Sequence, residues 1–196
     1  CHGSHGARPP GVGSIDKVCG QCHVQAREAL RHGPHAGGKG TAGEPQCEAC
    51  HGNHRIERAT HQMWTAVCVD CHDGESEAMR TGAKVLTLLQ QTEAEIARAH
   101  ESTASARRVP LDVREYESRL EMASTYLEEA RPQTHALDPE SVEELTRKAR
   151  SIAQQVQHDV ANELHVLEGR DLVVLVLWLY ILVTVAALQL YRRSLR

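Results

Sequence analysis

The sequence predicts a mainly α-helical protein made of a loop-rich amino-terminal segment (1–82), an antiparallel helical bundle or stalk (83–171) and a carboxyl-terminal transmembrane helix (172–191) with a basic tail (192–196). Three observations predict this order. The first 83 residues contain few Leu, Ile or Val, and Phe is absent from the chain, so this segment cannot build a large side-chain core. Apolar residues then recur at helical spacing. A run of twenty uncharged residues follows near the carboxyl end.

The amino-terminal segment carries three Cys-x-x-Cys-His motifs, at residues 19–23, 47–51 and 68–72. This is the attachment signature of c-type haem. Two thiols at this spacing can each form a thioether to one porphyrin vinyl group, while the adjacent histidine reaches back to the iron. The motifs therefore predict haem c in three complete sites, with thioethers at Cys19, Cys22, Cys47, Cys50, Cys68 and Cys71 and proximal iron ligands at His23, His51 and His72.

Paired Cys-x-x-Cys units also occur in zinc ribbons and in thioredoxin-like redox proteins. Those two alternatives do not require a histidine after each pair, whereas haem attachment does.

The odd cysteine of the seven is Cys1, which begins the stretch Cys-His-Gly-Ser-His. Residues 50–54 repeat it as Cys-His-Gly-Asn-His. The repeat predicts a fourth haem site whose first cysteine precedes Cys1 and whose proximal ligand is His2. The alternative is an acylated lipoprotein amino terminus, which would leave the repeated histidines unexplained.

With these motifs, the stretch from Cys1 to about Asp73 resembles the multihaem cytochromes c of the c3-like and membrane-anchored tetrahaem kind. The resemblance implies that most haems carry two axial histidines and lie close enough for electrons to pass between them. Thirteen histidines are enough for such a set, since four proximal ligands leave nine others. The expected distal ligands are His5, His32, His54 and His61, with His35 and then His135 as substitutes. His100, His158 and His165 are expected to be solvated or packed.

Three helices are expected after the motifs. The first runs from Ala83 to about Arg107, with Val85, Leu88, Leu89 and Ile96 on one face, and the second runs from Leu111 to about Ala130, with Pro132 beyond its end. Asp138 and Pro139 should start the third as cap and first helical residue. Its apolar positions continue the pattern: Val142, Leu145, Ala149, Ile152, Val156, Val160, Leu164 and Leu167.

The third helix runs into the uncharged stretch at 172–191, which matches a bilayer core of about 30 Å at 1.5 Å per residue. Arg192, Arg193 and Arg196 follow it, so the positive-inside rule places the carboxyl terminus in the cytoplasm. Haem is attached on the outer side of the bacterial cytoplasmic membrane, so both ends of the chain predict one single-pass topology with a periplasmic haem segment. An export signal is then expected to have preceded residue 1.

These features predict a non-enzymatic electron-transport protein of a respiratory chain. Its partners would be membrane redox complex subunits, reached through the carboxyl-terminal helix, and a soluble or surface redox protein. The alternative is a multihaem reductase or oxidase acting on a small nitrogen or sulfur compound, which needs an iron with an open position. A third possibility is that anchor and bundle serve assembly of a larger complex. The net charge of −4, with scattered Lys and Arg, gives no nucleic-acid footprint.

Overall fold

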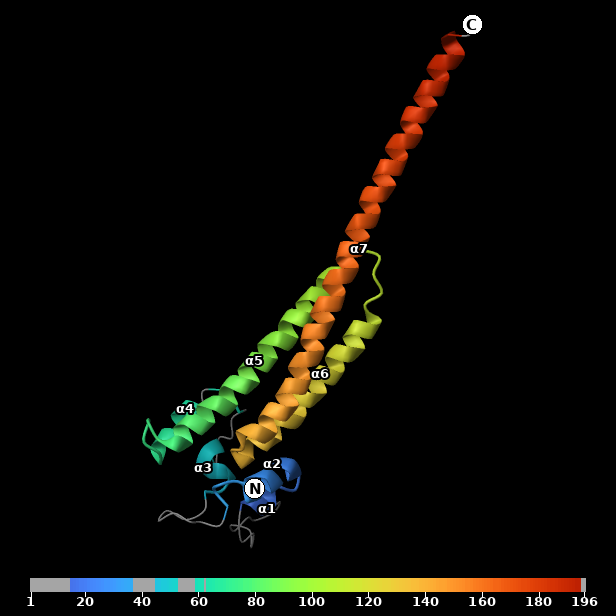
Figure 1. Cartoon of the computed structure of the whole chain (residues 1–196). Helices are drawn as coiled ribbons and strands as arrows, with labels where there is room; N and C mark the ends of the chain where they lie inside the picture. The colour runs from blue at the N-terminus through green and yellow to red at the C-terminus, as the bar shows by residue number, and fades with distance from the viewer. Residues whose placement is uncertain (1–14, 37–44, 53–58, 62, 195–196) are drawn as a thin grey trace.

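The computed structural model describes residues 15–36, 45–52, 59–61 and 63–194 of the chain, and within these ranges it is mainly α-helical with no strand (Figure 1). Short helices come first and long ones last. In chain order the elements are α1 (Asp16–Cys19), α2 (Val24–His32), α3 (Cys47–His51), α4 (Met63–Ala66), the 3-10 turn η1 (Cys68–Asp70), α5 (Glu77–Ala106), α6 (Arg114–Gln133), the 3-10 turn η2 (Thr134–Ala136) and α7 (Pro139–Ser194).

Helices α5, α6 and the first part of α7 pack into a bundle in which the chain direction alternates from one helix to the next (Figure 1). Its core confirms the predicted apolar faces. The centre is made of side chains with no exposed surface, among them Leu120, Val85 and Val156. Three threonines are buried with them, and each satisfies its hydroxyl by donating to the carbonyl oxygen four residues earlier: Thr92 to Leu88, Thr103 to Ala99 and Thr146 to Val142.

Three predicted helix boundaries were wrong. Helix α6 begins at Arg114, three residues after Leu111, where the Asp112 carboxylate accepts from the Arg114 backbone N–H at 3.2 Å. Helix α5 begins at Glu77, six residues before Ala83, because the Ser76 hydroxyl caps its first turn by accepting from the backbone N–H of Met79 at 3.3 Å. Helix α6 continues to Gln133 and contains Pro132 instead of ending before it. A proline in the last turn removes only one backbone donor, and the carbonyl that loses its partner belongs to an exposed residue open to water.

The turn from α6 to α7 has the predicted start signal. The Asp138 carboxylate accepts from the backbone N–H of Glu140 at 3.0 Å and from the Ser141 hydroxyl, while Pro139 is the first residue of α7. Leu137 has a left-handed backbone, with φ 50°, and lets the chain reverse within a few residues. The reversal fixes η2 at the end of the bundle.

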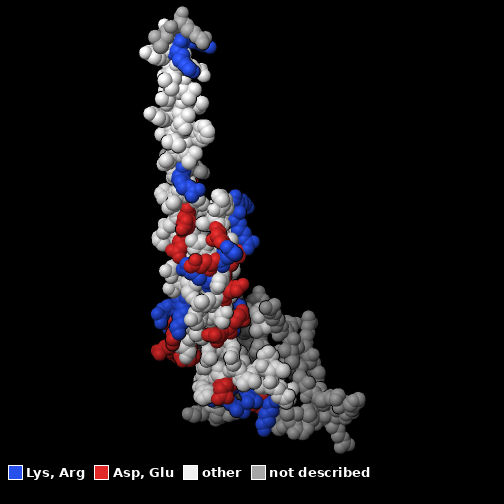
Figure 2. Space-filling model, turned by 90° about the vertical axis from the view of Figure 1, so that its right-hand side faces the viewer, with Lys and Arg blue, Asp and Glu red and all other residues white. Residues whose placement is uncertain are grey.

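Helix α7 is a single helix of 56 residues that leaves the bundle and continues alone (Figure 1). Its outer part has mean hydropathy 2.5, is not buried against other parts of the protein, and is long and apolar enough to cross a membrane once. Figure 2 shows this part as a shaft without charged side chains, with basic side chains near its two ends. The exposed apolar side chains begin at Val173 and end at Tyr191.

The motif-bearing segment lies at the opposite end of the bundle from this shaft (Figure 1). Helix α2 contacts η2 and α6, and α4 packs on α5, where the Trp64 ring meets Gly82. Among the described residues before α5, Gly20 and Ala29 are the fully buried ones. The segment therefore lacks a side-chain core of its own, as its composition predicted.

Candidate haem-binding site at the end of the bundle

Each of the three motifs forms about one helical turn. In the first and third, the histidine backbone N–H donates to the carbonyl oxygen of the first cysteine at 2.9 Å: His23 to Cys19 and His72 to Cys68. The second motif is the whole of α3, which ends at Gly52 with φ 75°. One turn places the first cysteine and the histidine, four residues apart, on the same side of the chain. This is the arrangement in which a thiol and an imidazole can both reach one flat ring system.

The cysteines of different motifs lie near one another, and all six are free thiols. Cys47 is within hydrogen-bonding reach of Cys19, and Cys50 lies close enough to Cys68 and Cys71 to affect its ionisation. Burial, with the neighbouring thiols, raises the pKa of Cys47 and of Cys50 above the usual value, and burial raises the pKa of Cys68. A thioredoxin-like pair works through a lowered thiol pKa, so these thiols do not have the character of a redox pair.

The second motif faces a histidine from the bundle. The ring of His51 lies 6.2 Å from that of His135 in η2, between ring centres, with 23° between the planes. His135 Nδ1 lies 3.0 Å from the Pro132 carbonyl oxygen. A donated Nδ1 proton leaves Nε2 with a free lone pair, the form in which imidazole binds metals. Burial lowers the pKa of His135, helped by nearby His51 and His23 and opposed by the Pro132 hydrogen bond, so the ring is neutral at pH 7.

The third motif has a similar neighbour. The ring centre of His72 lies 6.1 Å from that of His35, with 37° between the planes. Burial, and then the proximity of His72, lower the pKa of His35. His35 follows α2 in a loop in which Gly33 lies against η2, so one contact region positions both His35 and His135.

The two separations match what one shared iron would require. Because an imidazole nitrogen binds a metal at about 2.0 Å and the ring centre lies about 1.1 Å behind it, two imidazoles on opposite faces of one iron have centres about 6.2 Å apart. Among the described residues, His35 and His135 make the ring contacts with motif histidines. Both were expected only as substitutes, and the signals for them were the Pro-flanked turn around His135 and the loop after the 19–23 motif for His35.

The other expected ligands are placed differently. His32 is exposed, with Nδ1 2.8 Å from the Glu28 carbonyl oxygen. His61 Nε2 lies 3.3 Å from Glu93 Oε2, and the other oxygen of that carboxylate, Oε1, accepts from Arg131 at 2.8 Å. Neither His32 nor His61 makes a ring contact with a motif histidine, so iron binding by these two residues remains a prediction. Cys1, His2, His5 and His54 lie outside the described residues. His100, His158 and His165 are exposed, in line with the solvated reading.

Two polar side-chain atoms in the described part of the motif segment are buried without a hydrogen-bond partner, and one of them, on Arg27, suits a haem propionate. Arg27 Nε and one carboxylate oxygen of Glu48 are buried without a hydrogen-bond partner among the described residues. Arg27 belongs to α2, and its side chain packs on Gly20 inside the first motif. A guanidinium there suits a carboxylate such as a haem propionate. Free cysteine pairs, neighbouring imidazoles and the Arg27 guanidinium, whose Nε is buried without a described hydrogen-bond partner, together fit haem c at these motifs.

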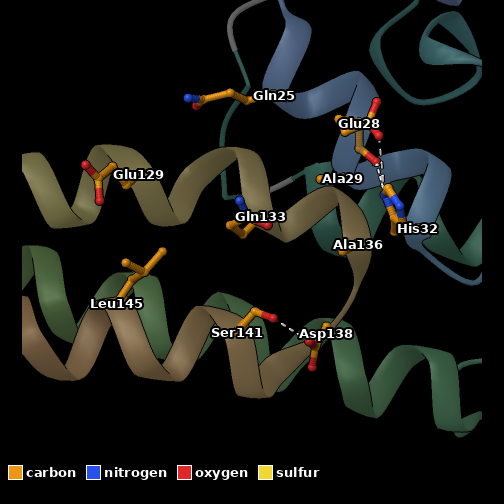
Figure 3. Close-up of a pocket in the computed structure, with 10 residues that line it drawn as sticks. All are labelled: Gln25, Glu28, Ala29, His32, Glu129, Gln133, Ala136, Asp138, Ser141 and Leu145. Atoms are coloured by element: carbon orange, nitrogen blue, oxygen red, sulfur yellow. Dashed lines mark hydrogen bonds and ion pairs between the residues drawn. The ribbon is translucent and has the colours of Figure 1, made fainter.

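A cavity of about 650 Å³ separates one face of α2 from the end of the bundle (Figure 3). Polar side chains dominate its lining, and three are carboxylates: Glu28, Glu129 and Asp138. His32 lies beside Glu28 at its margin, and Ser141 bonds to Asp138 (Figure 3). These three carboxylates would repel the propionates of a porphyrin bound against them.

In the part of the chain that the structure describes, no three side chains of the metal-binding types His, Cys, Asp and Glu converge on one point. The zinc-ribbon alternative therefore gains no geometric support, since it needs four donors around one ion. No protein-family model matches the chain, and searches of the curated proteins and of the solved structures likewise find no match.

Proposed function

We propose that the protein is a membrane-anchored multihaem cytochrome c that relays electrons outside the cytoplasmic membrane. Haem c would be held covalently at the three Cys-x-x-Cys-His motifs, with a fourth site at His2. The haem-bearing end would lie in the periplasm, the apolar part of α7 would span the membrane once, and the tail at Arg192 and Arg193 would lie in the cytoplasm.

The observation that carries this proposal is the pairing of motif histidines with histidines from elsewhere in the chain. His51 faces His135, and His72 faces His35, at separations suited to one iron between each pair. Haem supplies a reversible one-electron couple whose potential depends on its axial ligands and surroundings. The chain's part is to hold both imidazoles, neutralise the propionates with cations such as Arg27, and keep the sites adjacent.

Two axial imidazoles leave an iron no open position for a small substrate, so the geometry favours electron relay over a reductase or oxidase. His135 has a further role in the proposal. It belongs to the bundle, whereas His51 belongs to the motif segment. His51 and His135 would therefore hold one haem iron between them by coordination, and this would tie the motif segment to the bundle.

The test measures the absorption spectrum and the carbon monoxide binding of the haem-loaded full chain that carries His135→Ala. The matched control is the same chain with His158→Ala. His158 is an exposed histidine of α7 that bonds to Asn162 within the bundle. We expect His135→Ala to convert one haem to a five-coordinate, high-spin form that binds carbon monoxide, and added imidazole to restore the low-spin spectrum. His158→Ala should leave every haem low-spin.

Far-ultraviolet circular dichroism would show whether the bundle still folds in both variants. Unchanged low-spin spectra in a folded His135→Ala protein would show that His135 is not a ligand. Carbon monoxide binding by a large share of the iron in the unmodified chain, with turnover of a small substrate, would favour the enzyme.

A further inference from the structure

The length and straightness of α7 separate the haem-binding end of the protein from the membrane. Pro139, four residues after His135, starts the helix at the motif end, and the apolar run begins at Leu172. The 33 residues between those two positions extend about 50 Å at 1.5 Å per residue. A helix tilt of about 20–40° from the bilayer normal would still leave roughly 40–47 Å of height.

Side-chain bonds keep this separation from collapsing. Helix α7 is tied to α5 by Lys84 to Glu143 at 3.4 Å and by Gln157 to Glu95 at 2.7 Å. It is tied to α6 by Arg119 to Asp159 at 2.7 Å. The α7 partners in these bonds are Glu143, Gln157 and Asp159, and each lies next to a fully buried valine: Val142, Val156 and Val160. A close-packed core of this kind bends little, so the bundle acts as a rigid spacer.

The direction of the bundle excludes a folded-back arrangement of the described motifs. Helix α5 starts at the motif end and runs toward the membrane, and α6 returns (Figure 1). Among the described residues, the main contacts of the motif helices with the bundle are those of α2 with η2 and α6 and of α4 with α5, where Trp64 lies near Gly82. The His51–His135 and His35–His72 pairs thus lie at the end farthest from the apolar shaft.

Electron tunnelling through protein falls off exponentially with distance, and a gap of tens of ångströms is too wide for one step at a useful rate. We infer that the described haem sites exchange electrons with a redox centre carried in a water-exposed protein domain about 50 Å above the bilayer, and not with a quinol or haem dissolved in or buried within the membrane. This inference rests on the proposed function and names the class of its partner. A membrane complex could exchange electrons with these haem sites only through a domain that extends about 50 Å above the bilayer.

The two tryptophans of the chain offer a measurement of the height. Trp64 lies in α4, four residues before Cys68, whereas Trp178 lies in the apolar part of α7, 39 residues beyond Pro139. That is about 58 Å of helix. Haem quenches tryptophan emission by energy transfer, which falls steeply with distance. In the haem-loaded chain in lipid nanodiscs, we expect Trp64 to be dark and Trp178 to emit.

Two variants separate the signals. Trp64→Phe should keep nearly all of the emission of the haem-loaded chain, and Trp178→Phe should lose nearly all of it. Equal quenching of both tryptophans would overturn the inference, because it would place haem near the membrane. Unquenched Trp64 in a chain without covalent haem would instead contradict the proposed function, so the two failures are distinguishable.

The partner class is tested with the haem-loaded full chain in vesicles that contain a chemically reduced quinol confined to the bilayer. We expect no haem reduction above the background of vesicles without quinol, whereas a small reduced protein added to the water phase should reduce the haems. Reduction by the bilayer quinol as fast as by the soluble protein would overturn the inference.

Discussion

Gly33 is the point at which the motif segment touches the turn that carries His135. A Cβ atom added there would lie 2.9 Å from the carbonyl oxygens of both His135 and Ala136, and 3.0 Å from the Ala136 Cα. All three atoms belong to the backbone of η2, so no flexible side chain can move aside. Gly33 has φ −81°, a conformation open to alanine, and the expected effect of Gly33→Ala is therefore steric alone.

The cost follows from these distances. Ordinary contact begins at 3.4 Å, so α2 must move away from η2 by about half an ångström, and overpacking of this kind costs roughly 1–3 kcal/mol. Gly82→Ala is the matched control. Its Cβ would meet the Trp64 ring at 3.5 Å, an ordinary contact, and alanine inside a helix is more stable than glycine by about 0.5–1 kcal/mol.

The assay is thermal unfolding of the full haem-loaded chain in detergent, followed by circular dichroism, with absorbance of the haems recorded in parallel. One kcal/mol moves the midpoint by about 2–4 °C in a protein of this size. We expect Gly33→Ala to lower the midpoint and to raise the high-spin fraction, because His35 and His135 shift relative to their partners. Gly82→Ala should raise the midpoint slightly. Equal midpoints and equal spectra for the two variants would refute the docking of α2 on η2.

Three further predictions follow from the bundle and the anchor. Leu120→Ala, at a position with no exposed surface, should cost about 2–5 kcal/mol in chemical denaturation, whereas Met122→Ala, 52% exposed, should stay within about 0.5 kcal/mol. Asp138→Ala should cost about 1 kcal/mol at pH 7. The Ser141 hydroxyl lowers the pKa of Asp138 below 3.8, so this difference should persist above that pH and vanish as the pH falls through the lowered pKa; a pH-independent difference would contradict the cap. A tag after Arg196 should resist protease added to spheroplasts, and its digestion from outside would reverse the proposed topology.

The bundle and the shaft could be predicted from the sequence because both depend on local patterns. Apolar spacing identified the buried faces of α5, α6 and α7, and Asp138 with Pro139 marked the start of α7. The start of α5 was missed because its first turn is partly exposed and carries no apolar stripe, leaving only the Ser76 cap to indicate it.

The histidine pairs depend on packing between distant parts of the chain, which local patterns do not report. His51 and His135 are 84 residues apart, in α3 and in η2, and their rings lie 6.2 Å apart between centres. Proximity in sequence favoured His32 and His61 as ligands, and both remain predictions; in the structure His32 is exposed and His61 lies beside Glu93. Gly33 was visible in the sequence, but its role requires knowing that another backbone approaches it.

The central claim is that the three Cys-x-x-Cys-His motifs carry covalent haem, and the most direct measurement is mass spectrometry of the denatured protein purified from cells that can attach haem c. The account predicts an increase equal to one haem for each complete motif, found on the peptides that contain Cys19 and Cys22, Cys47 and Cys50, and Cys68 and Cys71. A mass equal to that of the polypeptide alone, with all six thiols free to react with an alkylating reagent, would contradict it.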